Sequence, residues 1–119
     1  MILVVDDDPV LTEMLKTILE KKGHSVVLAK DGAEAYEHLR APDCELMFLD
    51  INMPRINGAE LLILMSAEGI EVPTVVMAGF RDYSAEEIEE LPCVKGFLPK
   101  PFGVEEVMSV VERYGTGVE

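Results

Sequence analysis

The chain has 119 residues, enough for one domain with its own core, and its content of 49% hydrophobic but only 6% aromatic residues predicts a core of aliphatic side chains. Ten basic residues oppose 23 acidic ones, and the formal net charge of −13 argues against nucleic acid or an anionic membrane surface as a direct partner. A metal cation or a basic protein surface fits this charge better.

The N-terminal apolar run, Met1 to Val5, is too short for a membrane span or a signal peptide, and acidic residues follow it at once. Cys44 and Cys93 lie far apart, without the spacing of a metal or redox motif, which predicts reduced thiols. We therefore expect a cytoplasmic protein that does not insert into a membrane.

Five short apolar runs alternate with amphipathic stretches along the chain, and this alternation predicts a parallel sheet flanked by helices. The continuous and often β-branched character of the runs is typical of strands that are buried on both faces. The predicted strands are Ile2 to Val5, Val26 to Ala29, Leu46 to Leu49, Thr74 to Ala78, and Val94 to Leu98.

Helix signals follow the runs. Asp8 before Pro9 is typical of a helix N-cap and first helical position, and Gly23 of a helix end. Later capping patterns predict helices that begin at Asp31, Asn57 and Ser84, and a last one that begins near Gly103. Residues expected to face the core are Leu11, Met14, Leu15, Ile18, Leu19, Ala35, Tyr36, Leu39, Leu61, Leu64, Met65, Val107, Met108, Val110 and Val111. Five strand-helix units predict an open, doubly wound α/β sandwich, whose ligand site lies beyond the carboxyl ends of its strands.

Charged residues gather at those strand ends. Asp6 and Asp7 follow the first run, Asp50 follows the third, and Lys100 with Pro101 follows the fifth. Two carboxylates about 4 Å apart repel by roughly 4 kcal/mol at an effective dielectric constant near 20, so such a cluster should take up a proton or bind a cation. Hard oxygen ligands favour Mg²⁺, with Mn²⁺ as a substitute.

Asp50 is the candidate nucleophile of this site. A carboxylate can accept a phosphoryl group as a covalent aspartyl phosphate, while Mg²⁺ and an ammonium such as that of Lys100 neutralise the phosphoryl oxygens. The apolar run before Asp50 holds the carboxylate in place, and the Asn57-Gly58 turn lets the following loop fold around the ion.

Three motifs carry a resemblance to a known family: "ILVVDDDP" at residues 2–9, "FLDINMPRINGAELL" at residues 48–62 and "GFLPKPF" at residues 96–102. With these motifs the chain resembles the response-regulator receiver domain, the phosphoacceptor module of two-component signalling. The order and spacing of the intervening elements also fit, so the resemblance covers essentially the whole chain. It implies a flavodoxin-like (βα)5 doubly wound parallel sheet with strand order 2-1-3-4-5, a receiver domain over residues 1–114, and a tail or the start of a linker at residues 115–119.

The resemblance also implies a role for each matching residue. Asp50 corresponds to the phosphoacceptor, Asp7 to the direct Mg²⁺ ligand, and Asp6 to an acidic residue that acts largely through metal-bound water. The backbone carbonyl of Asn52 is expected to supply a further metal ligand. The family's phosphoryl-contacting lysine corresponds to Lys100, whose peptide bond to the proline after it is expected to be cis.

The implied phosphodonor is a phosphohistidine on a sensor histidine kinase or a histidine phosphotransfer protein. Phosphorylation changes the protein-interaction surface of such a domain, and the output passes to a protein partner or to an effector domain. The chain is therefore expected to be a signalling module and not an enzyme, beyond catalysing its own phosphorylation and dephosphorylation.

The sequence departs from the family pattern at the end of the fourth strand, where Ala78 replaces the usual Ser or Thr. Thr74 lies four residues earlier, about 13 Å away along a strand, and cannot supply the missing hydroxyl. The switch aromatic of the fifth strand is Phe97, which lacks the hydroxyl of the commoner Tyr. A hydrogen bond to a charged group contributes about 1.5 to 3 kcal/mol, against about 5.5 kcal/mol for a near-complete two-state switch. We therefore expect weakened switching but intact phosphorylation.

Two alternatives follow from the same residues. The first is a degenerate receiver that serves as a phosphorylation-insensitive docking domain, and Ala78 is its main support. The second is a haloacid-dehalogenase-type phosphatase, because "VVDDDPV" also fits that superfamily's pattern, with Asp6 as nucleophile and Asp8 as acid and base. Its weaknesses are the short chain and the unexplained "LDINMP" motif.

Overall fold

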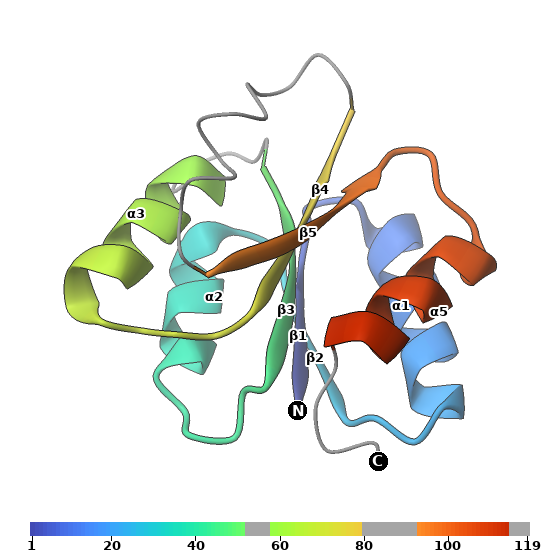
Figure 1. Cartoon of the computed structure of the whole chain (residues 1–119), viewed down its shortest axis with the longest axis horizontal. Coiled ribbons are helices and arrows are strands. Elements are labelled where there is room, and N and C mark those ends of the chain that lie inside the picture. Colours follow the sequence, from blue (N-terminus) through green and yellow to red (C-terminus); the bar gives the residue numbers. More distant parts are fainter. Residues whose placement is uncertain (52–57, 80–92, 115–119) are drawn as a thin grey trace.

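The apolar runs form one parallel sheet in the computed structural model, which describes residues 1–51, 58–79 and 93–114 (Figure 1). The sheet has five strands in the order β2-β1-β3-β4-β5, as the resemblance implied. The strands are β1 (Ile2–Val5), β2 (Val26–Ala29), β3 (Leu46–Asp50), β4 (Thr74–Ala78) and β5 (Val94–Pro99). The predicted bounds are confirmed to within one residue, because β3 includes Asp50 and β5 includes Pro99.

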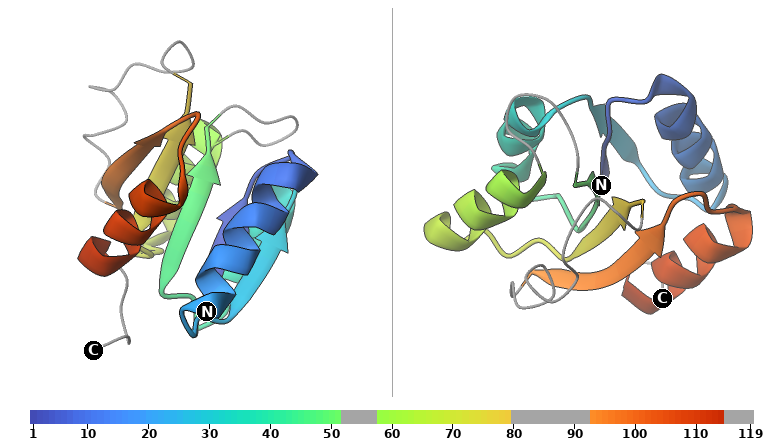
Figure 2. Two further views of the ribbon diagram at one scale, coloured as in Figure 1. Left: turned by 90° about the vertical axis from the view of Figure 1, so that its right-hand side faces the viewer. Right: turned by 90° about the horizontal axis from the view of Figure 1, so that it is seen from above.

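Helices cover both faces of the sheet. They are α1 (Pro9–Lys21), α2 (Gly32–Leu39), α3 (Gly58–Glu68) and α5 (Val104–Tyr114). Seen from above in Figure 2, α2 and α3 lie on one side of the sheet and α1 and α5 on the other. The helix predicted from Ser84, the metal-ligand prediction at Asn52 and the tail at residues 115–119 fall outside the described residues.

Strand β1 shows why the runs are continuously apolar. Its side chains alternate between two cores, because successive residues of a strand point to opposite faces. Leu3 and Val5 pack into the core under α2 and α3, whereas Ile2 and Val4 pack into the core under α1 and α5. Every residue of β1, β3 and β4 is buried, so these strands have no solvent-facing side for polar residues.

The predicted caps are confirmed at α1 and α2. The Asp8 side chain accepts hydrogen bonds from the backbone N–H groups of Val10 and Leu11, at 2.9 and 3.3 Å. Gly23 follows α1 with φ = 92°, a left-handed conformation that favours glycine. At α2, Asp31 accepts a hydrogen bond from the Glu34 N–H.

The predicted core faces are confirmed in part. Leu15, Leu19, Ala35, Leu39, Leu61, Met65, Val107 and Val111 are buried, while Leu11, Met14, Ile18, Tyr36, Leu64, Met108 and Val110 are half-buried. On α3 the prediction missed Leu62, which is fully buried. Since α3 is apolar on nearly all sides, helical periodicity gave little basis for choosing which residues face the sheet.

Both cysteines are free thiols. Burial is the main cause that raises the pKa of Cys44 and of Cys93, so both favour the neutral thiol. Among the described residues, no helix has the length and apolar character needed to cross a membrane.

Candidate phosphoacceptor site

Three carboxylates converge at the carboxyl end of the sheet. Strands β1 and β3 are adjacent and parallel, with Val5 opposite Leu49, so the next residues, Asp6 and Asp50, lie side by side. Asp7 joins them, and one carboxylate oxygen from each of the three lies within 4.8 Å of the others. The topology thus brings together residues that are 44 positions apart in the sequence.

The three carboxylates differ in their exposure to solvent. Asp6 and Asp50 are only 3% and 4% exposed, whereas Asp7 is exposed. The Asp6 carboxylate is fixed by its Oδ1, which accepts a hydrogen bond of 2.9 Å from the Asp8 N–H. Asp7 is therefore the carboxylate that is most open to an approaching ion.

Lys100 supplies the positive charge of the cluster. Its Nζ donates a hydrogen bond of 2.9 Å to Asp6 Oδ2 and lies 3.4 Å from Asp50 Oδ1. Partial burial alone would lower the pKa of Lys100, but the hydrogen bond and charge of Asp6, together with Asp50, outweigh burial and raise it. The ammonium is therefore charged at neutral pH.

The backbone around Lys100 also fixes its position. The Lys100 N–H donates a 3.0 Å hydrogen bond to the carbonyl oxygen of Ala78, which ties the β5 end to the β4 end. The Lys100–Pro101 peptide bond is cis, the isomer that the resemblance implies.

The donor set fits a divalent cation. Among the described residues, three carboxylates face one ammonium, so this part of the cluster carries excess negative charge, and its oxygens are hard ligands of the kind that Mg²⁺ prefers. Asp7 and Asp50 would hold the ion directly, while both oxygens of Asp6 already accept hydrogen bonds, from the Asp8 N–H and from Lys100.

Metal binding at this cluster predicts a measurable stabilisation. Adding Mg²⁺ at about one hundred times its dissociation constant should raise the free energy of unfolding by about 2.7 kcal/mol, because the ion binds the folded chain. Asp7→Asn should remove most of this gain, whereas Asp43→Asn, a matched substitution outside the carboxylate cluster, should retain it. Urea unfolding with and without Mg²⁺ measures the effect, and an equal gain in both variants would contradict the assignment.

Ala78 and Phe97, the residues predicted to form the switch, lie on the two neighbouring strands β4 and β5. Ala78 is buried at the end of β4, opposite Pro99 of β5, and Phe97 is half-buried on β5. Thr74 is fully buried, and its hydroxyl donates a 3.0 Å hydrogen bond to the Val72 carbonyl. That hydroxyl is thus engaged at the far end of the strand, so β4 offers the site no side-chain hydroxyl.

Gly58 also belongs to the site, although the sequence predicted only that it is part of a turn. A Cβ atom at this position would lie 2.6 Å from both the Asp50 carbonyl oxygen and the Ile51 Cα. The Gly58 N–H also donates a 3.1 Å hydrogen bond to the Ile51 carbonyl. Helix α3 therefore begins in direct backbone contact with the strand end that carries Asp50. The Asn-Gly pair was the available signal, but it suggests a turn more readily than a close approach.

This fold, with three carboxylates and a lysine at its carboxyl edge, defines a receiver-type module, and comparison with known proteins agrees. The response regulator receiver domain family matches residues 2–112, and the chain belongs to that family. It is a receiver domain of a response regulator in two-component signalling. Such domains are signalling modules and not classical enzymes.

The chain is similar to the response regulator MprA of Mycobacterium avium (strain 104), with 37% identity over 109 residues. The match covers 91% of this chain and 47% of MprA, so the chain spans about half the length of the curated relatives it matches. Among solved structures, the receiver domain of NtrX from Brucella abortus is 28% identical, with a TM-score of 0.85 over 98% of this chain and 99% of that one. A CheY-like receiver domain protein from Methanospirillum hungatei JF-1 shares the fold, with a TM-score of 0.87, 24% identity, and coverage of 98% and 94%.

The phosphatase alternative has no support from the geometry. It requires Asp8 as an acid and base, but the Asp8 carboxylate accepts two backbone hydrogen bonds at the start of α1. Asp6, its nucleophile, is engaged by Lys100 and by the Asp8 N–H. The family match over residues 2–112 favours the receiver domain over the phosphatase.

Proposed function

We propose that this chain accepts a phosphoryl group on Asp50 from a phosphohistidine of a sensor histidine kinase or a histidine phosphotransfer protein, with Mg²⁺ bound. The main support for this proposal is the position of Asp50. Its carboxylate is buried, lies 3.4 Å from the Lys100 ammonium and belongs to the cluster of three carboxylates. Bound Mg²⁺ would supply positive charge to offset the charge on the phosphoryl oxygens.

The residues of the site have different roles in phosphoryl transfer. An Asp50 carboxylate oxygen attacks phosphorus as the bond from phosphorus to the histidine nitrogen breaks. Lys100 is held by Asp6 and by the backbone of β4, so its ammonium is already in place to stabilise the phosphoryl oxygens. Asp7 and Asp50 would hold the metal, and the Asn52 carbonyl would supply a further ligand.

We further propose that phosphorylation changes the surface around β4 and β5, where Ala78 and Phe97 lie, and that a protein partner or an effector domain reads this change. The receiver domain occupies residues 1–114 in this proposal, residues 115–119 form a tail or linker, and the protein acts in the cytoplasm. The competing proposal, a docking domain that does not respond to phosphorylation, draws on the absence of a hydroxyl at residue 78.

Two substitutions of the same shape separate these proposals. Ala78→Thr adds a hydroxyl and Ala78→Val adds a methyl group in its place, so both bring the same bulk to the end of β4. One added hydrogen bond to a charged group should favour the switched state by about tenfold to a hundredfold in Ala78→Thr relative to Ala78→Val.

Backbone NMR spectra recorded with Mg²⁺ and beryllofluoride, a phosphoryl mimic, measure the switch. We expect shifts near Asp50 in the wild type, incomplete shifts at Phe97, and more complete shifts at Phe97 in Ala78→Thr than in Ala78→Val. A wild-type spectrum that does not change on adding both reagents would overturn the signalling proposal and support the docking domain.

A further inference from the structure

A pocket lies at the amino ends of β4 and β5, at the opposite end of these strands from the candidate phosphoacceptor site. Its volume is about 340 Å³, near the lower end of the range of roughly 300 to 1,000 Å³ that is typical of small-molecule sites. The end of α3, the segment before β4 and the start of β5 enclose it. Its lining includes Met65, Ile70, Glu71, Pro73, Cys93 and Lys95.

The interior of the pocket is apolar. Met65 is fully buried, and Cys93 leaves only 8% of its surface exposed. Ile70 and Pro73 are half-buried and still offer apolar surface to the pocket. Burial raises the pKa of Cys93, so its thiol is neutral and adds no charge to the interior. The interior therefore fits one compact aliphatic or aromatic group.

Two opposite charges lie at the rim of the pocket. Glu71 and Lys95 both line it, and both are exposed to solvent. Within the described part of the chain, these two side chains form no salt bridge with each other or with a third residue. Their charges are therefore open to a ligand, and one carboxylate with one ammonium matches the two charges of a zwitterion.

An irregularity in β5 places Lys95 at this rim. Val94 pairs with Thr74 and Gly96 pairs with Val75, so Lys95 is an extra residue between two successive pairs. Such a bulge is rare between parallel strands, and bulges are over-represented next to active sites, where they redirect a side chain. Successive residues of a regular strand point to opposite faces. Here, however, Val94 packs against the core under α2 and α3, and Lys95 lines the pocket beside that same core.

We propose that this pocket binds a free α-amino acid with an apolar side chain. The side chain lies in the apolar interior, the ligand carboxylate lies at Lys95, and the ligand ammonium lies at Glu71. The formal net charge of −13 favours a zwitterion over an organic acid without an amine, because it repels an anion at long range but not a neutral molecule. The inference goes beyond the phosphorylation of Asp50 and does not depend on it.

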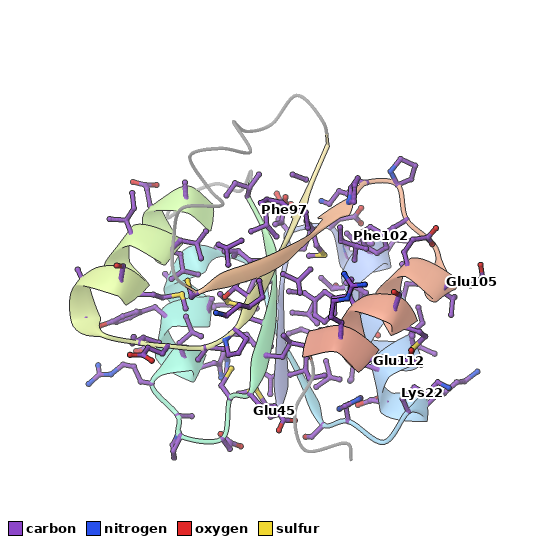
Figure 3. The ribbon with its side chains drawn as sticks, viewed as in Figure 1. Lys22, Glu45, Phe97, Phe102, Glu105 and Glu112 are labelled. Carbon is purple, nitrogen blue, oxygen red and sulfur yellow. The ribbon has the colours of Figure 1, made fainter. Side chains whose placement is uncertain are left out.

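Two matched pairs of substitutions test the rim. Lys95→Met removes the ammonium but keeps a long side chain, and Lys22→Met makes the same change at an exposed lysine after α1. Glu71→Gln removes the carboxylate, and Glu112→Gln makes the same change on α5. Figure 3 shows Lys22 and Glu112 on the side of the sheet that α1 and α5 cover, away from α3. All four residues are exposed, so the variants should fold.

The probes are L-phenylalanine, 3-phenylpropionate and 2-phenylethylamine, which share a phenyl group on a two-carbon chain and differ only in their charged groups. NMR titration of the isotope-labelled chain, without any phosphodonor, measures each affinity. We expect L-phenylalanine to bind about fivefold more tightly than either other probe and to shift the signals of Ile70, Cys93 and Lys95. Its affinity should fall by about threefold to fivefold in Lys95→Met and in Glu71→Gln, and stay nearly unchanged in the two control variants.

Cys93 supplies an independent readout. A ligand in the pocket covers this thiol, so saturating L-phenylalanine should slow the alkylation of Cys93 by iodoacetamide, as measured by peptide mass spectrometry. Cys44 is the internal control, because it is also a free thiol but does not line the pocket. Its alkylation rate should not change.

Four outcomes would overturn the proposal. Equal affinities for the three probes would mean that the phenyl group alone binds. Tighter binding of 3-phenylpropionate than of L-phenylalanine would assign the pocket to organic acids. Equal losses in the rim variants and their controls would separate binding from Lys95 and Glu71. The absence of any shift with L-phenylalanine or with the smaller L-leucine would exclude an amino acid from the pocket.

Discussion

Gly58→Ala is expected to lower the free energy of unfolding by about 1 to 3 kcal/mol, although alanine is normally the better helix former. The added Cβ would lie 2.6 Å from the Asp50 carbonyl oxygen and the Ile51 Cα, and both are backbone atoms that cannot rotate away. The start of α3 or the end of β3 must therefore move. Because Asp50 belongs to β3, the rate of phosphorylation should fall by about a hundredfold, the cost of misplacing a reacting group by roughly 1 Å.

Gly103→Ala is the matched control. Its Cβ would meet only the Glu106 Oε1, at 3.1 Å, and that atom is the end of a flexible side chain. We expect the free energy of unfolding to change by about 0.5 kcal/mol or less and the phosphorylation rate to stay the same. Urea unfolding and the time course of phosphate incorporation measure both variants. Equal behaviour of the two variants would show that the contact between α3 and β3 is not what positions Asp50.

Lys100→Met is expected to lower the free energy of unfolding by about 1 to 3 kcal/mol in the absence of divalent ions. The substitution leaves Asp6 and Asp50 buried and facing each other without the ammonium that now lies 2.9 and 3.4 Å from their oxygens. Breaking a fully buried pair costs about 3 to 5 kcal/mol, and a smaller loss is expected here because the Lys100 side chain is 29% exposed and its charge is partly screened by solvent. Mg²⁺ should recover part of the loss.

A double-mutant cycle tests the cause of this loss. Asp50→Asn removes one of the facing carboxylates, so Lys100→Met should cost less in that background than in the wild type. Lys30→Met is the control, since Lys30 is 73% exposed and lies 3.7 Å from Glu34, and it should change stability by about 0.5 kcal/mol or less. If Lys100→Met costs the same in both backgrounds, the ion pair with Asp50 is not its origin.

The difference in unfolding free energy between the wild type and Lys100→Met should depend on pH. The pKa of Lys100 is raised in the folded chain, so its contribution is fully present below the unfolded value of about 10.4. It is lost as the pH rises through the folded value. As the pH is raised, the difference in unfolding free energy between the wild type and Lys100→Met should therefore persist up to about pH 10.4 and narrow above it.

Much of the fold was predictable because its signals are local or periodic. The strand runs are continuous, as strands covered on both faces require, and capping residues such as Asp8 and Asp31 are determined by their nearest neighbours in sequence. The strand order was not derivable from these signals and came from the family resemblance. The side of α3 that faces the sheet was also difficult to predict, because nearly every side of that helix is apolar.

The candidate site was predictable from one topological rule, that the carboxyl ends of parallel strands meet at one edge. From this rule, Asp6, Asp50 and Lys100 were predicted to lie close together in the fold, although they are far apart in the sequence. The rule gives no distances, so it did not predict that Lys100 pairs more closely with Asp6 than with Asp50. Nor did it predict the contact at Gly58, which depends on how α3 packs on β3 and not on any local pattern.

The most direct measurement is intact-mass spectrometry after incubation with acetyl phosphate, with and without Mg²⁺, on the wild type and on Asp50→Asn and Asp6→Asn. We expect one phosphate adduct on the wild type that requires Mg²⁺, no adduct on Asp50→Asn, and a reduced adduct on Asp6→Asn. Absence of an adduct on the wild type, or an adduct that persists in Asp50→Asn, would contradict the assignment of Asp50 as the phosphoacceptor.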